Sequence, residues 1–364
     1  MQIRSRCTPV QRLKQLVHHL NGFELIEPYA GQKWSSVESI HTSAEEFAEV
    51  RGQGFAKRAL EIAASGGHNV LMIGPPGAGK TMLARRLPGI MPSLTREESI
   101  ETSAVHSVAG LLAAGECLIR QRPYRSPHHT ITAPAIIGGG RNPLPGEVSL
   151  AHNGVLFLDE FTEFPRATLE SLRQPLEDGF VTIARTHSSV RYPARCMLVA
   201  AMNPCPCGYF GDRTRHCSCT ALQVQRHLSK ISGPLLDRID IHIQLQPVTK
   251  NRLLGEDKAE TSASIRSRVE KARSIQLERF NRTGIVCNAQ MSTSQVRKLC
   301  KFSQEARSLM EAAITELGLS ARSFYRILRV ARTIADLEGA GEIDSRHISE
   351  ALQYRYLDRD LWRR

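Results

Sequence analysis

Short apolar runs alternate with stretches of helical spacing between residues 46 and 247. Helical spacing covers residues 55–65 and 81–87, and the second of these segments ends before Pro88. The apolar runs are too short for helices and are typical of buried strands; they occupy residues 70–73, 155–158 and 196–201. Strands separated by helices predict an α/β fold, in which a parallel sheet is covered by helices on both faces.

Two segments interrupt this alternation, and we expect both to project from the sheet as insertions. Residues 123–145 are rich in glycine, proline and histidine. Within them, His128 and His129 are interpreted as residues of an interface or pore loop, with metal ligation as the alternative. Residues 179–190 alternate apolar and polar side chains, which predicts a β-hairpin.

The pattern changes after residue 247. Residues 248–261 predict a linker, and five helical segments without any strand pattern follow it. Each of these segments begins near a serine, a favoured N-cap residue; they are residues 262–280, 292–300, 303–317, 320–337 and 345–356. Residues 262–364 are therefore expected to form a separate, smaller α-helical domain.

The first residues differ from both regions. Residues 10–20 have helical spacing and stop at Asn21 and Gly22, whereas residues 27–42 are rich in turn residues and show no period. We interpret residues 1–45 as the end of an N-terminal domain and a linker.

Composition adds a charge argument and argues against two classes of protein. The chain has 48 Lys and Arg against 36 Asp and Glu, a formal charge of +12, which attracts nucleic acid but equally favours solubility. No apolar stretch approaches the roughly 18 residues of a membrane-spanning helix, and the first residues lack the apolar core of a secretory signal. We expect a cytoplasmic protein with no membrane partner.

The most specific motif is a phosphate-binding loop that directly follows the first predicted strand. In the pattern G-x-x-x-x-G-K-T, glycines turn backbone N–H groups toward phosphates, the lysine reaches the β and γ oxygens, and the threonine hydroxyl binds Mg²⁺. The helix after it directs its positive end at the same anion. We expect ATP and Mg²⁺ to be bound by Gly74, Pro75, Pro76, Gly77, Ala78, Gly79, Lys80 and Thr81.

Polar side chains follow the other two predicted strands. Asp159 and Glu160 come directly after the second strand; we expect Asp159 to hold Mg²⁺ together with Thr81, and Glu160 to orient and deprotonate the attacking water. Asn203 lies at the end of the third strand, where its amide can bond the γ-phosphate or that water. The alternative for Asn203 is the start of a turn.

Four of the nine cysteines are clustered in two C-x-C pairs. Without an export signal they are not expected to form a disulfide framework. Four thiolates can surround zinc tetrahedrally, but C-x-C is tighter than the usual C-x-x-C spacing, so a structural zinc and free thiols both stay open. His216 is an alternative ligand. The four are Cys205, Cys207, Cys217 and Cys219, in a loop over residues 205–219.

Several strings beyond these motifs resemble the magnesium-chelatase-like AAA+ proteins, and the ComM/YifB branch of that family most closely. They occur in the family's order over about residues 47–356. The strings, by first residue, are R-G-Q at 51, P-H-H at 127, G-G-G at 138, P-G-E-V-S-L-A-H at 145, N-P-C-P-C-G at 203, S-G-P-L-L-D-R-I-D at 232 and A-R-T-I-A-D-L at 331.

The resemblance implies an architecture. Residues 46–247 resemble a three-layer AAA+ P-loop NTPase core, with a helix-2 insert near residues 123–145 and a pre-sensor hairpin near residues 179–190. Residues 262–364 resemble the helical lid of the family. Family members carry a Lon-like domain ahead of the ATPase, and residues 1–45 are interpreted as its remnant, so we expect an N-terminal truncation.

The resemblance also implies assembly and further site residues. The family forms homo-oligomeric rings, usually hexamers. By resemblance, Arg238 is the arginine finger that reaches the γ-phosphate bound by a neighbouring subunit. Arg322 resembles the sensor 2 arginine of the lid, with Arg326 as the alternative.

Three functions follow from these expectations. ComM-like proteins are ATP-driven DNA motors that promote branch migration and strand integration in natural transformation, so DNA is the expected partner, and the positive charge agrees with it. A magnesium chelatase subunit, which drives metal insertion into a porphyrin, shares the same core. A regulator that binds ATP without hydrolysing it is disfavoured, because Glu160, Asn203 and Arg238 are all present.

Overall fold

The computed structural model describes residues 10, 12–27, 45–112, 118–140, 142–185, 188–212, 215–247, 260–281 and 283–355. The chain divides into two units, Met1–Glu38 and Ser39–Arg364. In the first unit, α1 (Leu13–Leu20) confirms the predicted helix and buries none of its residues. Most of the predicted linker at residues 248–261 and the end of the chain after residue 355 lie outside the described residues.

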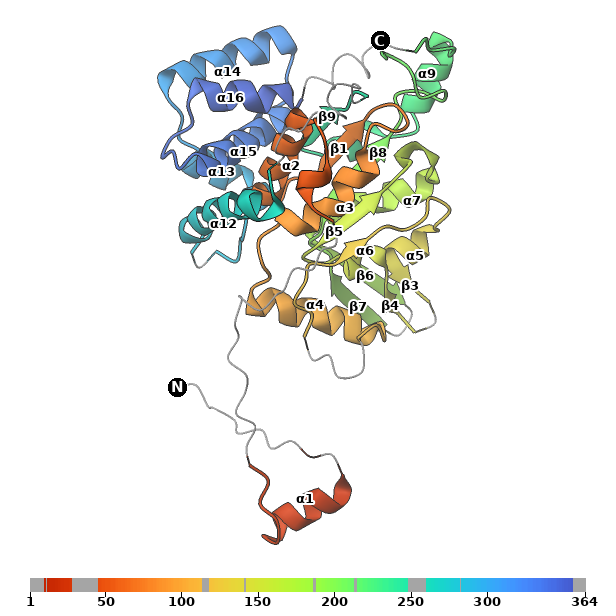
Figure 1. Cartoon of the computed structure of the whole chain (residues 1–364), viewed down its shortest axis with the longest axis vertical. Coiled ribbons are helices and arrows are strands. Elements are labelled where there is room, and N and C mark those ends of the chain that lie inside the picture. The colour runs from red at the N-terminus through yellow and green to blue at the C-terminus, as the bar shows by residue number, and fades with distance from the viewer. Residues whose placement is uncertain are drawn as a thin grey trace. The chain divides into compact units, whose positions relative to one another are not determined.

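A parallel five-stranded sheet forms the centre of the second unit (Figure 1). The strand order is β2-β5-β8-β1-β9, and every neighbouring pair runs parallel. The strands are β1 (Val70–Ile73), β2 (Tyr124–Arg125), β5 (Val155–Leu158), β8 (Met197–Met202) and β9 (Ile241–Gln244). β1, β5 and β8 confirm the three predicted strands. Because β8 lies between the other two, the loops that leave their carboxyl ends meet at one edge of the sheet.

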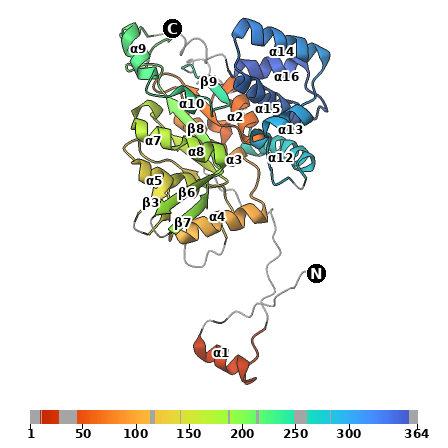
Figure 2. The same ribbon diagram turned by 180° about the vertical axis from the view of Figure 1, so that it is seen from behind.

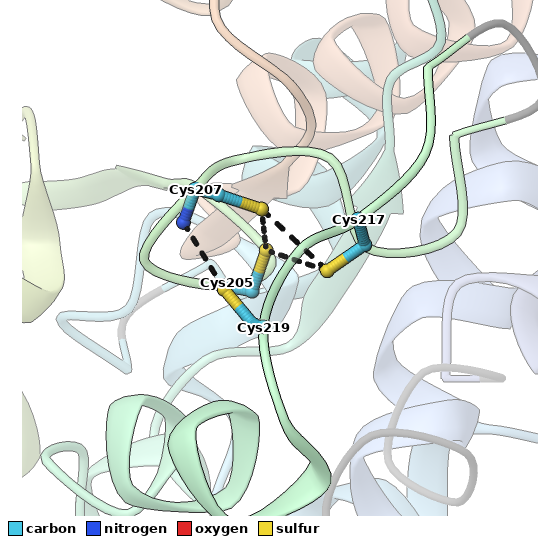
Figure 3. Close-up of side chains that lie close together, drawn as sticks. All are labelled: Cys205, Cys207, Cys217 and Cys219. Carbon is cyan, nitrogen blue, oxygen red and sulfur yellow. Dashed lines mark hydrogen bonds between the residues drawn. The ribbon is translucent and has the colours of Figure 1, made fainter.

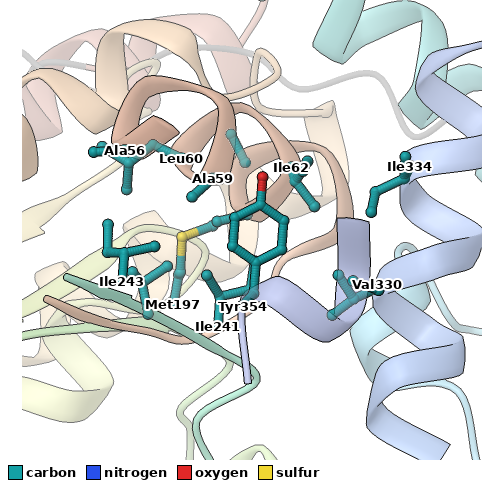
Figure 4. Close-up of a cluster of buried hydrophobic side chains, with 14 of the residues drawn as sticks. Ala56, Ala59, Leu60, Ile62, Met197, Ile241, Ile243, Val330, Ile334 and Tyr354 are labelled. Atoms are coloured by element: carbon teal, nitrogen blue, oxygen red, sulfur yellow. The ribbon is translucent and has the colours of Figure 1, made fainter. Parts of the chain in front are cut away.

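Both faces of the sheet are buried, since successive side chains of a strand point to opposite faces. On one face, Met72 and Ile243 pack under α2 (Gly54–Gly66) and α3 (Lys80–Ile90). Figure 4 shows part of this core, where Tyr354 lies close to the strand residues and to α2. The opposite face packs against the helices that follow β2, β5 and β8, as the α/β pattern predicted.

The helices outside the C-terminal region are short, apart from α2, α3 and α4. Besides those of α2 and α3, their bounds are η2 (Phe47–Glu49), α4 (Arg96–Val108), α5 (Ala133–Ile137), α6 (Glu147–Leu150), η3 (Phe161–Glu163), α7 (Arg166–Ser171), α8 (Arg173–Asp178), α9 (Ala221–Leu228) and α10 (Gly233–Leu236).

The end of α3 differs from the expectation, because the helix continues past Pro88 to Ile90. Proline has no N–H to donate, so one hydrogen bond of the last turn is lost. The Met91 N–H still donates to the Leu87 carbonyl at 3.2 Å. Leu87 and Ile90 are fully buried, and their burial offsets the missing bond.

Two strands of the sheet were not predicted. β2 has only two residues and lies inside the segment that was expected to be an insertion; it pairs with β5 at the edge of the sheet. β9 alternates isoleucine with His242, which is itself buried. The polar residue interrupts the apolar run that would have identified a buried strand.

The two predicted insertions contain antiparallel strand pairs that lie side by side (Figure 2). The Tyr192 hydroxyl donates to the Pro143 carbonyl at 2.8 Å, which joins one insertion to the other. The pairs are β3 (Gly138–Gly139) with β4 (Leu144–Pro145), and β6 (Phe180–Arg185) with β7 (Ser188–Pro193). The second pair confirms the predicted hairpin.

The C-terminal region is helical, as predicted. α12 and α15 pack on α2, so these helices share one hydrophobic cluster with the sheet. Serine N-caps are confirmed at Ser292, Ser303 and Ser320, whereas Thr261 caps the first helix. The elements are α12 (Ser262–Arg279), η4 (Asn288–Gln290), α13 (Thr293–Leu299), α14 (Gln304–Leu317), α15 (Ala321–Leu337) and α16 (Ser345–Gln353). Across the described ranges, none of the helices has the length and apolar character needed to cross a bilayer.

Candidate functional site

The predicted phosphate-binding loop lies where β1 passes into α3. Gly79 caps the helix with φ 88°, a left-handed conformation that glycine adopts without strain. A Cβ atom built on Gly77 or Gly79 would meet no atom within 4 Å. The loop therefore faces open space at the positive end of a helix, which is the geometry that phosphate requires.

The Lys80 side chain folds over this loop. Its ammonium group donates to the carbonyls of Gly74 at 2.6 Å and Pro75 at 3.0 Å, and to Oδ1 of Asn203 at 3.0 Å. Burial lowers the pKa of Lys80, and the nearby Asp159 carboxylate opposes this shift. A positive charge is thus held between the loop and the end of β8.

Thr81 and Asp159 meet although 78 residues separate them in the chain. The Thr81 hydroxyl donates to Asp159 Oδ2 at 2.6 Å, and Asp159 Oδ1 accepts the Glu160 N–H at 2.9 Å. Hydroxyl and carboxylate oxygens are the ligands that Mg²⁺ prefers, usually beside the phosphates of its substrate. Two such oxygens next to the phosphate-binding loop fit the predicted Mg²⁺ site.

Glu160 has a strained backbone and a histidine partner. Its φ is 52°, in the left-handed region, which costs a residue with a side chain on the order of 1–3 kcal/mol. The carboxylate lies 3.1 Å from Nδ1 of His129, and the His129 ring packs against that of His128 with centroids 4.1 Å apart. From the sequence, His129 is interpreted as a residue of an interface or pore loop, with metal ligation as the alternative. In the structure its ring contacts Glu160, the predicted catalytic base.

Asn203 is held on two sides. Its side chain accepts from Lys80, and its carbonyl oxygen lies 3.0 Å from Nε2 of His227 on α9. Because a carbonyl can only accept, Nε2 of His227 carries the proton. The same nitrogen lies 3.4 Å from the Thr162 hydroxyl, in the turn after Glu160. Sequence reasoning missed His227, since nothing in the spacing of α9 distinguishes it from a core histidine.

Arg238 lies at the opposite end of the sheet from the phosphate-binding loop. Its carbonyl accepts from the Asn69 side chain at 2.8 Å, and Asn69 precedes β1, whereas the loop follows it. A strand of four residues is about 13 Å long. The guanidinium group donates to the Arg173 and Pro234 carbonyls and pairs with Glu177.

Arg322 and Arg326 lie at this same end. Both contact Asp237, with N–O distances of 3.6 Å and 3.5 Å respectively. Together with Arg238 they line a cavity of about 580 Å³. The Arg322 side chain is 75% exposed and that of Arg326 only 11%, so Arg322 is the freer of the two to reach another molecule. The structure therefore groups the predicted catalytic residues into two sets at opposite ends of the sheet.

The four clustered cysteines converge (Figure 3). Sulfur–sulfur distances are 3.4 Å for Cys205–Cys207, 3.7 Å for Cys205–Cys217 and 3.5 Å for Cys207–Cys217, and all four sulfurs lie within 4.8 Å of one another. Four sulfurs around zinc, each about 2.3 Å from the metal, are about 3.8 Å apart. The exposed His216 is not part of this group.

Two of these sulfurs accept hydrogen bonds from the backbone, and the pKa values of the thiols differ within the cluster. Backbone N–H groups of Phe210 and Cys207 donate to the sulfurs of Cys205 and Cys219 at 3.3 Å and 3.4 Å. The Tyr209 N–H and further hydrogen bonds lower the pKa of the Cys207 thiol to about 5. Burial instead raises the pKa of Cys205 to about 12, so a metal ion has to displace the proton of that thiol.

Two family models match the chain. The model of the magnesium chelatase subunit ChlI matches residues 46–253, and the model of the C-terminal part of that subunit matches residues 259–355. Together they include the sheet, both insertions, the cysteine loop and the C-terminal helices.

Individual relatives agree with these matches. Competence protein ComM of Haemophilus influenzae is 44% identical over 357 residues, which cover 96% of this chain and 68% of ComM. YifB of Escherichia coli is 45% identical over 318 residues, covering 87% of this chain and 61% of YifB. A more distant relative, the DNA replication licensing factor Mcm6 of Drosophila melanogaster, is 25% identical over 325 residues, 85% of this chain and 35% of Mcm6.

Proposed function

The chain belongs to the magnesium-chelatase-like AAA+ family, in the branch that contains ComM and YifB, and from this premise we propose that it is an ATP-hydrolysing ring motor that acts on DNA. The observation that carries the ATPase proposal is the convergence of Lys80, Thr81, Asp159 and Asn203 on one loop. These residues come from three separate strand ends, and their chemistry is that of phosphate and Mg²⁺ binding.

The proposed roles follow from these positions. Lys80 and the loop N–H groups bind the β and γ phosphates. The oxygens of Thr81 and Asp159 would hold Mg²⁺, which would supply positive charge beside those phosphates. Glu160 orients and deprotonates the attacking water, while Asn203 bonds the γ-phosphate or that water.

We propose that Arg238 and Arg322 act on the nucleotide of a neighbouring subunit. Both lie beside Asp237, at the far end of the sheet from their own phosphate-binding loop. From this position, neither arginine can reach the nucleotide bound by its own subunit. Both can reach the nucleotide bound by a second copy of the chain if the subunits are arranged head to tail. Head-to-tail contacts that close form rings, and we propose a hexamer.

Lys80→Ala is expected to weaken ATP binding roughly 10- to 100-fold, since it removes a charged hydrogen-bond donor from the phosphates. The measurement is the Kd of a fluorescent ATP analogue in the presence of Mg²⁺. Lys57→Ala is a matched control, because Lys57 lies on α2 outside the loop and its loss should leave the Kd unchanged. Tight binding by the Lys80 variant would contradict the assignment of the loop.

DNA is proposed as the substrate of the motor, with branch migration as its action. Three findings support this choice: the +12 charge, the two adjoining insertions as candidate contact loops, and the relation to a DNA replication licensing factor. The names of the matching family models instead favour a second candidate, a chelatase motor that drives metal insertion into a porphyrin.

Single-stranded or four-way-junction DNA is expected to raise the ATPase rate severalfold, and the effect should fall with added salt because phosphate contacts release counterions. The measurement compares single-stranded, duplex and junction DNA with no DNA. A rate that responds to none of these would reject the DNA motor and favour the chelatase candidate.

We propose that the four cysteines bind one structural zinc ion. Removing it with a zinc-selective chelator is expected to lower Tm by several degrees, since structural zinc contributes folding free energy directly. The measurement is Tm with and without chelator, alongside zinc content. Purified protein that holds no zinc, even after incubation with zinc under reducing conditions, would favour free thiols.

A further inference from the structure

We propose that the cysteine loop couples metal binding to nucleotide binding: with a metal ion held by the four cysteines, the loop fixes Asn203 and Pro76 in the nucleotide site. Without the metal, both lose their support and nucleotide binding weakens. This inference rests on the proposed ATP site and the proposed metal site, and it concerns the connection between them.

The first connection is through the chain itself. Cys205 is separated from Asn203 only by Pro204, whose ring restricts the backbone. Cys205 is fully buried, and Asn203 accepts from the Lys80 ammonium at 3.0 Å. A metal ion bound to the Cys205 sulfur therefore also restrains the Asn203 amide, which contacts Lys80.

The second connection is a direct contact between the loop and the phosphate-binding loop. Gly208, which follows Cys207, has φ 86°, and a Cβ atom built on it would lie 2.7 Å from Cδ of Pro76. No side chain fits between these two segments. The Cys205–Cys207 pair thus positions backbone that packs directly on the nucleotide site.

The third connection approaches Asn203 from the other cysteine pair. Cys219 is followed by Thr220, which caps α9 by accepting the Gln223 N–H. On that helix, His227 donates to the Asn203 carbonyl at 3.0 Å. A metal ion bound to both C-x-C pairs therefore restrains Asn203 from two sides, through Cys205 and through α9.

The test measures nucleotide affinity rather than hydrolysis. The Kd of a fluorescent ATP analogue is compared, at constant Mg²⁺, for zinc-loaded protein and for protein treated with a zinc-selective chelator; zinc content is measured in parallel. We expect binding about tenfold weaker after zinc removal, the effect of losing one hydrogen bond to a charged group, and recovery when zinc is restored.

Two variants distinguish the effect of the metal ion from the effect of the contact between Gly208 and Pro76. Cys207→Ser combined with Cys217→Ser should lose zinc and bind nucleotide as weakly as chelated protein. Gly208→Ala, compared in its zinc-loaded form, should bind nucleotide more weakly, because its Cβ atom pushes against Pro76 and alanine is strained at φ 86°. Cys196→Ser is the control: Cys196 precedes β8, at the opposite end from Asn203, and its replacement should change neither zinc content nor Kd.

The outcomes distinguish this inference from the proposals beneath it. An unchanged Kd in protein shown to have lost its zinc overturns the coupling and leaves the ATP site intact. Zinc-loaded protein that binds no nucleotide overturns the ATP site, and the coupling with it. Protein that takes up no zinc overturns the metal site and, again, the coupling.

Discussion

Replacing Arg238 with alanine is expected to lower kcat for ATP hydrolysis about 10³–10⁵-fold, the range measured for arginine residues that complete a neighbouring site. The Kd for ATP should change far less than kcat, because the phosphate-binding loop, at the far end of β1 from Arg238 of the same subunit, keeps its own contacts with ATP. Steady-state ATPase rates and nucleotide titration of the same preparation measure the two quantities.

Mixing the Arg238→Ala and Lys80→Ala proteins tests whether the arginine acts between subunits. At a mixed interface, the first variant supplies an intact phosphate-binding loop and the second supplies Arg238. ATPase activity should therefore rise above that of either protein alone and pass through a maximum as the mixing ratio varies. No recovery in rings shown to contain both proteins would reject the role in trans.

Glu177→Gln is the matched control for this experiment. Glu177 pairs with the Arg238 guanidinium, and its own side chain is largely exposed. Neutralising it releases the arginine without removing it, so activity should stay far above that of Arg238→Ala. A loss as deep as that of Arg238→Ala would mean that the surface needs the ion pair itself rather than a guanidinium group free to reach a neighbour.

The candidate residues of the nucleotide site could be selected from the sequence because they follow strands. β1, β5 and β8 are apolar enough to be identified, and each ends in a polar residue or loop of distinct chemistry. In a parallel sheet, the carboxyl ends of neighbouring strands meet at one edge. The structure adds the strand order, which brings Lys80 to Asn203 and Thr81 to Asp159.

His129 and His227 could not be predicted in the same way. Each lies in a segment whose local pattern says nothing about its partner, and each contacts a residue that is distant in the chain. β9 was missed for a related reason, since a buried histidine interrupts its apolar pattern. Only the three-dimensional arrangement identifies these partners.

The position of Arg238 at one end of the sheet could also be determined only from the structure. The string around Arg238 identifies the residue by family resemblance, but a resemblance gives no position relative to this chain's own loop. The Asn69–Arg238 hydrogen bond supplies that position, because Asn69 precedes the strand that the loop follows. From this position we expect Arg238 to act on the nucleotide of a neighbouring subunit.

Glu160→Gln is expected to lower kcat about 10²–10⁴-fold, the usual contribution of a general base. The amide keeps the shape of the side chain but cannot accept the proton of the attacking water. The Kd for ATP should stay the same, because the Glu160 carboxylate contacts His129 and not the loop, whereas Asp159 contacts Thr81. Single-turnover hydrolysis and nucleotide titration separate the two effects.

Glu163→Gln is the control for Glu160→Gln. It shows whether the lower kcat results from loss of the catalytic base or from removal of one negative charge near the site. Glu163 lies in the turn directly after Glu160, and its carboxylate pairs with Lys230 on the surface. Exposed pairs of this kind contribute about 0–1 kcal/mol, so this variant should turn over like the unmodified protein. If the two variants lose activity equally, local charge explains the effect; normal turnover by Glu160→Gln would assign the base to another residue. A large loss in Glu160→Gln alone identifies Glu160 as the group that takes the proton.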